Sequence, residues 1–261
     1  MRPLTLTVLG SSGTHPGPAR ACASYLVEHE GYRLLLDCGN GSLANLQQRF
    51  DVADIDALLV SHLHPDHFVD LYGLYYARRF HRDGPLPLPV YAPVGAAGFI
   101  GRLLGSDEEF RGVCRFTESA AGETLDLGPL TVRLHAADHP VETLAPRVEA
   151  GGRVLAYSGD SGPTPALVDC ARDADLFLCD ATWLDRDGPH PAGVHMTGKQ
   201  AGAHAAAAGA ASLVLTHVYP TIDRDEVAAE AAAVYDGTIL VARDLEEHPL
   251  TDGHPQPRGS G

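Results

Sequence analysis

The stretch Ser61-His62-Leu63-His64-Pro65-Asp66-His67 decides how the rest of the sequence is interpreted. It follows an apolar segment, 56–61, that is predicted to be a short β-strand. One residue separates its first two histidines, so extended backbone would point both imidazoles the same way. The aspartate and the third histidine come where the chain must turn into a helix, so they can reach a neighbouring position. We therefore predict two adjacent metal sites rather than one.

Two metals need more ligands, and three candidates also stand at the ends of apolar segments. His139 follows 134–138, Asp160 follows 154–159 and His217 follows 213–216. A lone histidine or aspartate at a strand end is usually a capping or core residue, but all three are expected at one edge of the fold. Zinc and similar metals accept histidine nitrogen and aspartate oxygen, and a catalytic site keeps an open position for water.

The His-x-His-x-Asp-His pattern at 62–67, with these later residues in order, resembles the metallo-β-lactamase superfamily. The resemblance implies an α/β fold of the αββα type, in which two mixed β-sheets are flanked by helices. It also implies two metal ions with Asp160 as the bridging ligand. One ion would take His62, His64 and His139, and the other Asp66, His67 and His217. The true β-lactamases carry cysteine in place of Asp160, so antibiotic hydrolysis is disfavoured.

His195 narrows the resemblance to one branch of the superfamily. The segment around it, 193–201, is similar to the His-Ser/Thr-Ala segment of ribonuclease Z and the cyclic-nucleotide phosphodiesterases, although Met196 departs from that pattern. Asp180-Ala181-Thr182 is similar to the acidic-Ala-Thr segment of the same branch. The resemblance implies that His195 assists phosphodiester cleavage. The alternative is a histidine at a helix N-terminus with no chemical role.

The expected chemistry follows from the charge of a phosphodiester, which repels an attacking hydroxide. Two divalent ions, zinc first and manganese or iron as alternatives, would neutralise the phosphate and lower the pKa of a bridging water. Asp66 is expected to orient the resulting hydroxide or take its proton, and His195 to protonate the leaving oxygen. Asp66 and His195 are thus the predicted catalytic residues.

The substrate is expected to be a small, cyclic nucleotide phosphodiester. Bacterial ribonuclease Z, by resemblance, carries a long arm between the third metal histidine and the bridging aspartate, whereas one hairpin fills that interval here. The loop 14–22 lacks the Lys-x-Arg-Asn run expected there, and the net charge is −15. A ribonuclease Z-like RNA 3′-end endonuclease and a lactone or thioester hydrolase remain alternatives, and a scaffold protein is disfavoured because every ligand position is filled.

Aromatic residues near the motif have two interpretations. Tyr72 and Tyr76 are four residues apart in a predicted helix and therefore on one face. That face could stack a purine, with Arg78 and Arg79 beyond it, or it could pack in the core. Trp183 has the same two interpretations.

Composition excludes several classes of protein. The chain has 261 residues, of which 44% are hydrophobic and 20% charged, as in globular proteins. The net charge of −15 argues against non-specific binding of nucleic acid. No run of apolar residues is long enough for a transmembrane helix, and the N-terminus does not resemble a signal peptide. Five cysteines without a Cys-x-x-Cys pair favour reduced thiols in the cytoplasm. A homodimer is expected only from the resemblance.

The pattern of apolar residues predicts one domain over 1–245, followed by a disordered tail over 246–261. Each half of the domain is expected to form a sheet with helices outside it. Strands are predicted at 3–9, within 24–37, at 56–61, at 90–91, within 131–157, and at 175–179, 213–216 and 238–241. Helices are predicted at 42–50, 68–80, 163–171, 197–208 and 223–235.

Overall fold

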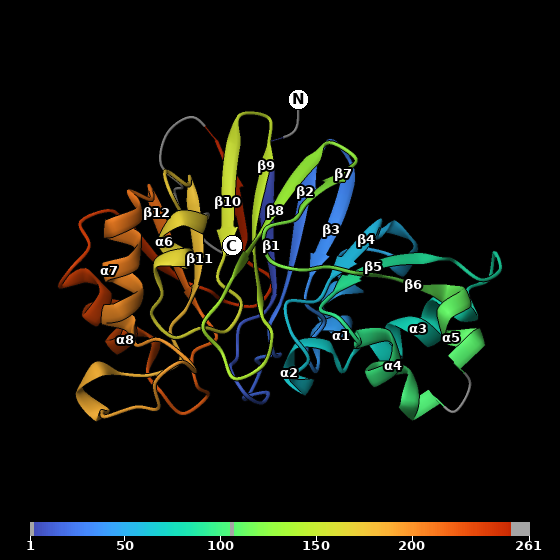
Figure 1. Ribbon diagram of the computed structural model, residues 1–261, viewed down its shortest axis with the longest axis horizontal. Helices are drawn as coiled ribbons and strands as arrows, with labels where there is room; N and C mark the ends of the chain where they lie inside the picture. The colour runs from blue at the N-terminus through green and yellow to red at the C-terminus, as the bar shows by residue number, and fades with distance from the viewer. Residues whose placement is uncertain (1–2, 105–106, 252–261) are drawn as a thin grey trace.

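The computed structural model describes residues 3–104 and 107–251. Two β-sheets of seven strands each lie in the middle of the molecule, and helices cover the outer face of each sheet (Figure 1). The predicted αββα sandwich is confirmed. No helix in the described part of the chain is long and apolar enough to cross a membrane.

The first sheet is antiparallel at one end and parallel at the other. Its order is β14-β1-β2-β3-β4-β5-β6. Pairing is antiparallel from β14 to β3 and parallel from β3 to β6. The strands are β1 (Leu4–Gly10), β2 (Ser24–His29), β3 (Tyr32–Leu36), β4 (Ala57–Leu59), β5 (Leu88–Ala92), β6 (Cys114–Glu118) and β14 (Glu247–Leu250).

The second sheet repeats this layout with the order β13-β12-β11-β10-β9-β8-β7. Pairing is antiparallel from β7 to β10 and parallel from β10 to β13. The strands are β7 (Thr124–Leu127), β8 (Leu130–Ala136), β9 (Leu144–Ala150), β10 (Arg153–Tyr157), β11 (Leu176–Asp180), β12 (Ser212–Thr216) and β13 (Thr238–Val241).

Helices pack on the outside of each sheet. The first sheet carries α1 (Ser42–Leu46), α2 (Pro65–Phe68), α3 (Leu71–Arg79), α4 (Ala96–Gly101) and α5 (Asp107–Val113), with the 3₁₀ turns η1 (Val52–Asp54) and η2 (Arg102–Leu104). The second carries α6 (Pro165–Cys170), α7 (Gly198–Ala208) and α8 (Arg224–Ala232), with η3 (Asp185–Asp187). The alanine-rich α7 begins at a capping box between Thr197 and Gln200, and it ends at Gly209 with φ of 66°.

Alternation along the strands divides the core into three layers. In β3, Leu34 and Leu36 pack between the two sheets, whereas Leu35 packs under the helices of the first sheet. Tyr25 and Tyr157 meet edge to face in the central layer, with ring centroids 5.0 Å apart. Because the central strands are covered on both faces, β11 and β12 are buried along their whole length.

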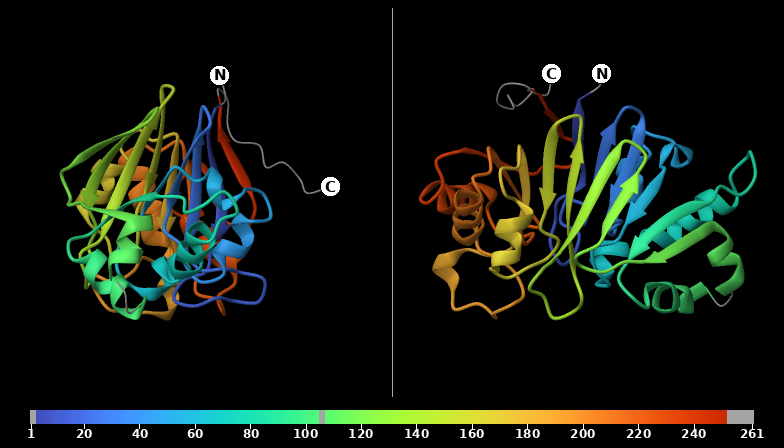
Figure 2. Two further views of the ribbon diagram at one scale, coloured as in Figure 1. Left: turned by 90° about the vertical axis from the view of Figure 1, so that its right-hand side faces the viewer. Right: turned by 45° about the horizontal axis from the view of Figure 1, so that its top comes forward.

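The predicted disordered tail is wrong for its first residues. Residues 247–250 form β14, which lies antiparallel to β1 along the edge of the first sheet (Figure 2). Leu250 enters the central core and His248 is buried. β14 covers the otherwise open edge of β1, which is a sufficient physical reason for order here. The rest of the predicted tail, 252–261, lies outside the described residues.

The helix predicted over 68–80 is α3, which begins three residues later, at Leu71, and the short helix α2 precedes it. The chain forms α2, breaks at Val69–Asp70, and resumes as α3. This break matters because it places the last two residues of the histidine stretch on a separate short helix. The sequence pattern assigns no element between Ala92 and Leu130, where the structure has α4, α5, β6 and β7.

Candidate metal centre

The seven predicted ligands converge at one edge of the sandwich. They come from the loop and the short helix α2 that follow β4, and from the chain just beyond β8, β10 and β12. Their ligand atoms form two groups, each within 4.8 Å, that share one carboxylate. The first group is His62, His64, His139 and Asp160, and the second is Asp66, His67, Asp160 and His217. The structure therefore brings together every residue that the sequence singled out as a ligand.

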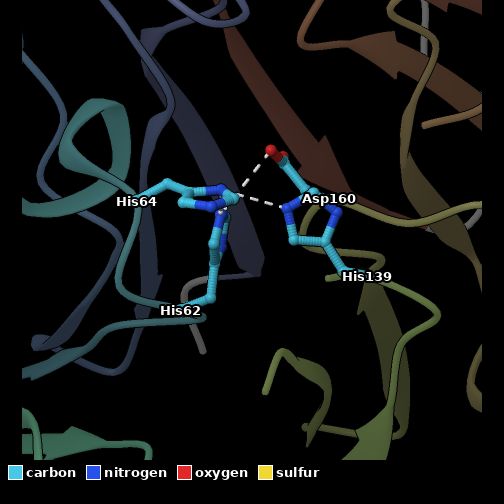
Figure 3. Close-up of side chains that lie close together, drawn as sticks. All are labelled: His62, His64, His139 and Asp160. Carbon is cyan, nitrogen blue, oxygen red and sulfur yellow. Dashed lines mark hydrogen bonds and ion pairs between the residues drawn. The ribbon is translucent and has the colours of Figure 1, made fainter. Parts of the chain in front are cut away.

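The first group is a cluster of three imidazoles (Figure 3). His64 Nδ1 lies 3.1 Å from His62 Nε2 and 3.0 Å from His139 Nε2. One nitrogen cannot donate a single hydrogen to both neighbours. Two nitrogens bound tetrahedrally to one zinc ion would lie about 3.3 Å apart. The observed spacing is therefore close to what one cation between the three rings would require.

Hydrogen bonds behind these rings fix which nitrogen carries the hydrogen. His139 Nδ1 donates to the carbonyl of Val194 at 2.8 Å, which leaves a lone pair on Nε2. His62 Nδ1 lies 3.0 Å from Ser61 Oγ, and that hydroxyl itself donates to Asp37. The hydroxyl must then accept from His62, so the Nε2 of His62 also keeps its lone pair. Metal-ligating histidines typically donate their other ring hydrogen to such a group, so both rings are oriented as metal ligands would be.

The second group surrounds one oxygen of Asp160. Asp160 Oδ1 is 3.1 Å from His67 Nε2 and 3.3 Å from His217 Nε2. Asp66 Oδ2 is also 3.3 Å from His217 Nε2. The other oxygen of Asp160 faces the first group, 3.7 Å from His62 Nε2. One carboxylate therefore offers an oxygen to each group.

The same kind of support fixes the rings of the second group. His67 Nδ1 donates to Asp37 Oδ2 at 2.8 Å. His217 Nδ1 lies 2.9 Å from Thr182 Oγ1, which donates in turn to Asp180 Oδ1 at 2.7 Å. Thr182 must then accept from His217. Both rings therefore turn Nε2 towards Asp160.

Asp37 is a functional residue that the sequence analysis did not single out. It is fully buried and has φ of 59°, a left-handed conformation that is rare outside glycine. Its carboxylate accepts hydrogen bonds from Ser61 N and Oγ, from His67 and from Tyr157 Oη. Its position after the apolar strand β3 is the same signal that identified the ligands. Asp37 fixes both the start of the histidine loop and one ring of the second group.

The residues fit two divalent cations. Asp160 Oδ1 is buried, yet it accepts no hydrogen bond from any described residue, although two imidazole nitrogens face it. Burial lowers the pKa of each histidine in the first group, which favours the neutral form that a metal ligand requires. Burial also opposes a charge on His67, but Asp160 and Asp37 outweigh it and raise the pKa of that ring well above its usual value. A bound cation would displace the proton held there.

Close backbone contacts hold the second group in place. A Cβ on Gly13 would lie 2.3 Å from the carbonyl oxygen of His217, so only glycine allows this approach. The next residue, Thr14, donates its backbone N–H to Asp66 Oδ2 at 2.9 Å. His217 itself has φ of 56°. Strain of this kind persists where the surrounding structure enforces it, as at functional sites.

His195 lies beside both groups and is held by Asp180. Its Nδ1 donates to Asp180 Oδ2 at 2.8 Å and is 3.8 Å from Asp160 Oδ2. Burial alone would lower the pKa of His195, but Asp180, and then Asp160, raise it to about 9. No described residue accepts from its Nε2. The structure therefore places His195, which the sequence analysis singled out by the resemblance at 193–201, next to the candidate ligands.

The aromatic residues separate into two classes. Tyr72 donates its hydroxyl to Ile100 O at 2.8 Å and packs in the core, so it joins α3 to α4. Tyr76 is half exposed and stacks on Phe80. Arg78 is buried and donates to backbone carbonyls, which is a structural role. Trp183 contacts His195 edge to face, with ring centroids 5.1 Å apart.

Comparisons with known proteins agree with this geometry. The family described as "Beta-lactamase superfamily domain" matches residues 32–218. The uncharacterized protein Rv1339 of Mycobacterium tuberculosis is 37% identical over 90% of this chain and 88% of its own length. The probable metallo-hydrolase YhfI of Bacillus subtilis is 30% identical over 92% of this chain and 97% of its own.

A solved structure and a further relative extend the comparison. The crystal structure of YhfI superposes with a TM-score of 0.86 over 95% of this chain and 99% of that one, at 27% identity. The ribonuclease Z of Haloarcula marismortui is 29% identical over 92% of this chain and 95% of its own. The family match covers well over half of the chain, and it includes every candidate ligand. The chain therefore belongs to the β-lactamase superfamily, among its metallo-hydrolases.

Proposed function

We propose that this chain is a dinuclear metal-dependent phosphodiesterase that hydrolyses a small, cyclic nucleotide phosphodiester. The observation that carries the proposal is the His195–Asp180 pair beside the two groups of ligands. Because the pair fixes His195 Nδ1 as a donor, its Nε2 is free to interact with a substrate. A phosphodiester has a poor leaving group and needs such a residue.

His62, His64 and His139 would hold one ion, and Asp66, His67 and His217 the other, with Asp160 between them. Imidazole and carboxylate ligands in this number favour zinc, with manganese or iron as alternatives. When bound, two such ions neutralise the phosphodiester and lower the pKa of the attacking water.

The protein side chains supply the proton transfers. Asp66 Oδ2 is fixed by the N–H of Thr14, so its carboxylate is positioned to orient the attacking water and accept its proton. His195 Nε2 gives a proton to the leaving oxygen. Asp180 keeps the imidazole in one orientation and stabilises its positive charge, and Asp180 is itself held by Thr182 and the N–H of Ser161.

Two features favour a small substrate over RNA. β9 and β10 are joined by a tight turn at Gly151–Gly152, so no arm extends between the third histidine and the bridging aspartate. The net charge of −15 opposes a polyanion at long range. The ribonuclease Z relatives keep an RNA 3′-end substrate as the alternative. A lactone or thioester is the second alternative, since its hydrolysis would not require His195.

The test is hydrolysis of 3′,5′-cyclic AMP and bis-p-nitrophenyl phosphate by metal-replete protein. A His195→Ala variant and a chelated sample run beside it, with His135→Ala as the matched control on β8. We expect chelator-sensitive turnover of both esters, reduced about 10²–10⁴-fold in the His195 variant and unchanged in the control.

Other outcomes separate the alternatives. Turnover of bis-p-nitrophenyl phosphate alone would support the metal site and favour an RNA 3′ end as the substrate. No turnover of either ester by protein that holds two metals would overturn the phosphodiesterase proposal and favour lactones or thioesters.

A further inference from the structure

A hollow of about 390 Å³ opens beside the metal centre. It is bounded by the loop 185–193, the first turn of α7, Pro163 and Asp138. Its volume lies within the range of small-molecule sites. Neither the fold nor the metal chemistry requires this space.

The hollow begins at the catalytic residues. His195 is one of its walls, and Asp138 directly precedes His139. The loop is fixed to the centre because Val194 O accepts from His139 Nδ1 at 2.8 Å. A substrate with its phosphorus at the metals and its leaving oxygen at His195 would therefore place the adjoining group in the hollow.

The walls are shaped for a flat, uncharged group. Pro163, Pro189 and Pro191 line the space, and the fixed φ of proline reduces the entropy lost when a ligand binds. His190 is held flat by Trp183, whose ring stacks on it at 4.6 Å between centroids and 15° between planes. No arginine or lysine lines the hollow, so a second phosphate would bind there without a counter-charge.

Two side chains that line the hollow, Asp138 and His190, offer hydrogen-bond acceptors. Neither oxygen of Asp138 accepts a hydrogen bond or an ion pair from a described residue. His190 donates its Nε2 hydrogen to Leu184 O, which leaves Nδ1 as an acceptor. Asp185, by contrast, is paired with Lys199 at 3.0 Å. Asp138 is exposed, so its carboxylate and His190 Nδ1 can accept hydrogen bonds from the N–H donors of a ligand in the hollow.

We propose that this hollow binds the base of the nucleotide substrate, that the base is a purine with an exocyclic amino group, and that Asp138 accepts its N–H. The proposal rests on the phosphodiesterase function above and assigns its substrate class. Asp138 becomes a specificity-determining residue of the site, and His190 backed by Trp183 provides the flat wall.

Binding of nucleosides tests the base site without catalysis. Trp183 is the only tryptophan of the chain, so its fluorescence reports on ligands next to His190. Metal-replete protein is titrated with adenosine and with purine riboside, which lacks only the amino group. We expect adenosine to bind about tenfold more tightly, as one hydrogen bond to a charged acceptor provides.

Two variants test which carboxylate of the hollow causes the preference for adenosine. Asp138→Asn keeps the size of the side chain, and we expect it to abolish the advantage of adenosine while two metals stay bound. Asp185→Asn changes a carboxylate of the same hollow that is already paired, and we expect it to preserve the advantage. With 3′,5′-cyclic AMP, Asp138→Asn should raise KM more than it lowers kcat.

Equal binding of the two nucleosides by the unmodified protein would overturn the proposal, as would an unchanged preference in Asp138→Asn. A failure of the proposed phosphodiesterase function would give a different result. No ester would then be hydrolysed, while the nucleoside titrations would still decide whether the hollow binds an amino-bearing purine.

Discussion

Replacing Asp37 by asparagine should weaken the binding of metal at the second site, although none of the candidate ligands is replaced. The carboxylate is fully buried, and its Oδ2 accepts from Ser61 Oγ, His67 Nδ1 and Tyr157 Oη. Asparagine has the same shape but only one acceptor oxygen. If that oxygen keeps the bond from Ser61 N, an NH₂ group faces the other three. The hydroxyls can turn to accept from it, but His67 must move its hydrogen to Nε2, where the ligand lone pair is required.

The magnitude follows from the loss of this support. Outer residues that fix a ligand's tautomer typically contribute about 10–100-fold to metal affinity. That range corresponds to about 1.4–2.8 kcal/mol. One buried donor without a good acceptor would lower the free energy of unfolding by about 1–3 kcal/mol as well. The first metal site should lose less affinity, since Asp37 reaches it only through Ser61 Oγ, which accepts from His62 Nδ1.

The assay is competition with a chelator, followed by the metal retained per chain, together with urea unfolding of the metal-free protein. Asp126→Asn, on the exposed edge strand β7, is the matched control. We expect Asp37→Asn to hold one tight and one weakened metal. Two metals with unchanged affinity, and an unchanged unfolding midpoint, would refute the role given to Asp37.

Three further predictions test other parts of the account. Thr182→Val removes the acceptor for His217 Nδ1 and should also weaken the second metal about tenfold, with rescue by serine, measured by the same competition. Tyr72→Phe should cost about 1 kcal/mol of stability in urea unfolding and leave turnover unchanged, whereas a large rise in KM would instead place Tyr72 at the substrate. Burial raises the pKa of Cys114 and Cys170 to about 12, so only the unfolded chain loses these protons above about pH 8.5. Stability should therefore fall as pH rises beyond that value, and an unfolding midpoint that stays level to pH 10 would contradict it.

The candidate ligands could be predicted from sequence because each lies in the short stretch of chain that follows a run of apolar residues. β8, β10 and β12 of the second sheet run in the same direction and end at the same edge, and β4 of the first sheet ends there too, so the residues that follow them meet. His195 was harder to place, since it lies outside any strand and is positioned through Asp180, the last residue of β11.

The supporting residues could not be predicted, because their contacts join segments far apart in the chain. Asp37 reaches Ser61 and His67 only when β3 and β4 pair in parallel. The hollow that holds Asp138 likewise needs the loop 185–193 to return beside His139. A periodic pattern predicts an element, but not which loops will face each other.

β14 was not predicted from the sequence, for a different reason. Four residues including Pro249 give too short a pattern, and it is the open edge of β1 that orders them. Strand segments of this length are decided by the sheet they join rather than by their own propensity.

The central claim is that seven residues hold two metal ions bridged by Asp160. The most direct measurement is the number of metal ions per chain in the purified, metal-replete protein, His139→Ala and His217→Ala, together with anomalous scattering from crystals of the same samples. The account predicts two ions per chain in the parent, with one peak weakened in each variant and the opposite peak retained. A single ion per chain in the parent, or a peak away from Asp160, would contradict it.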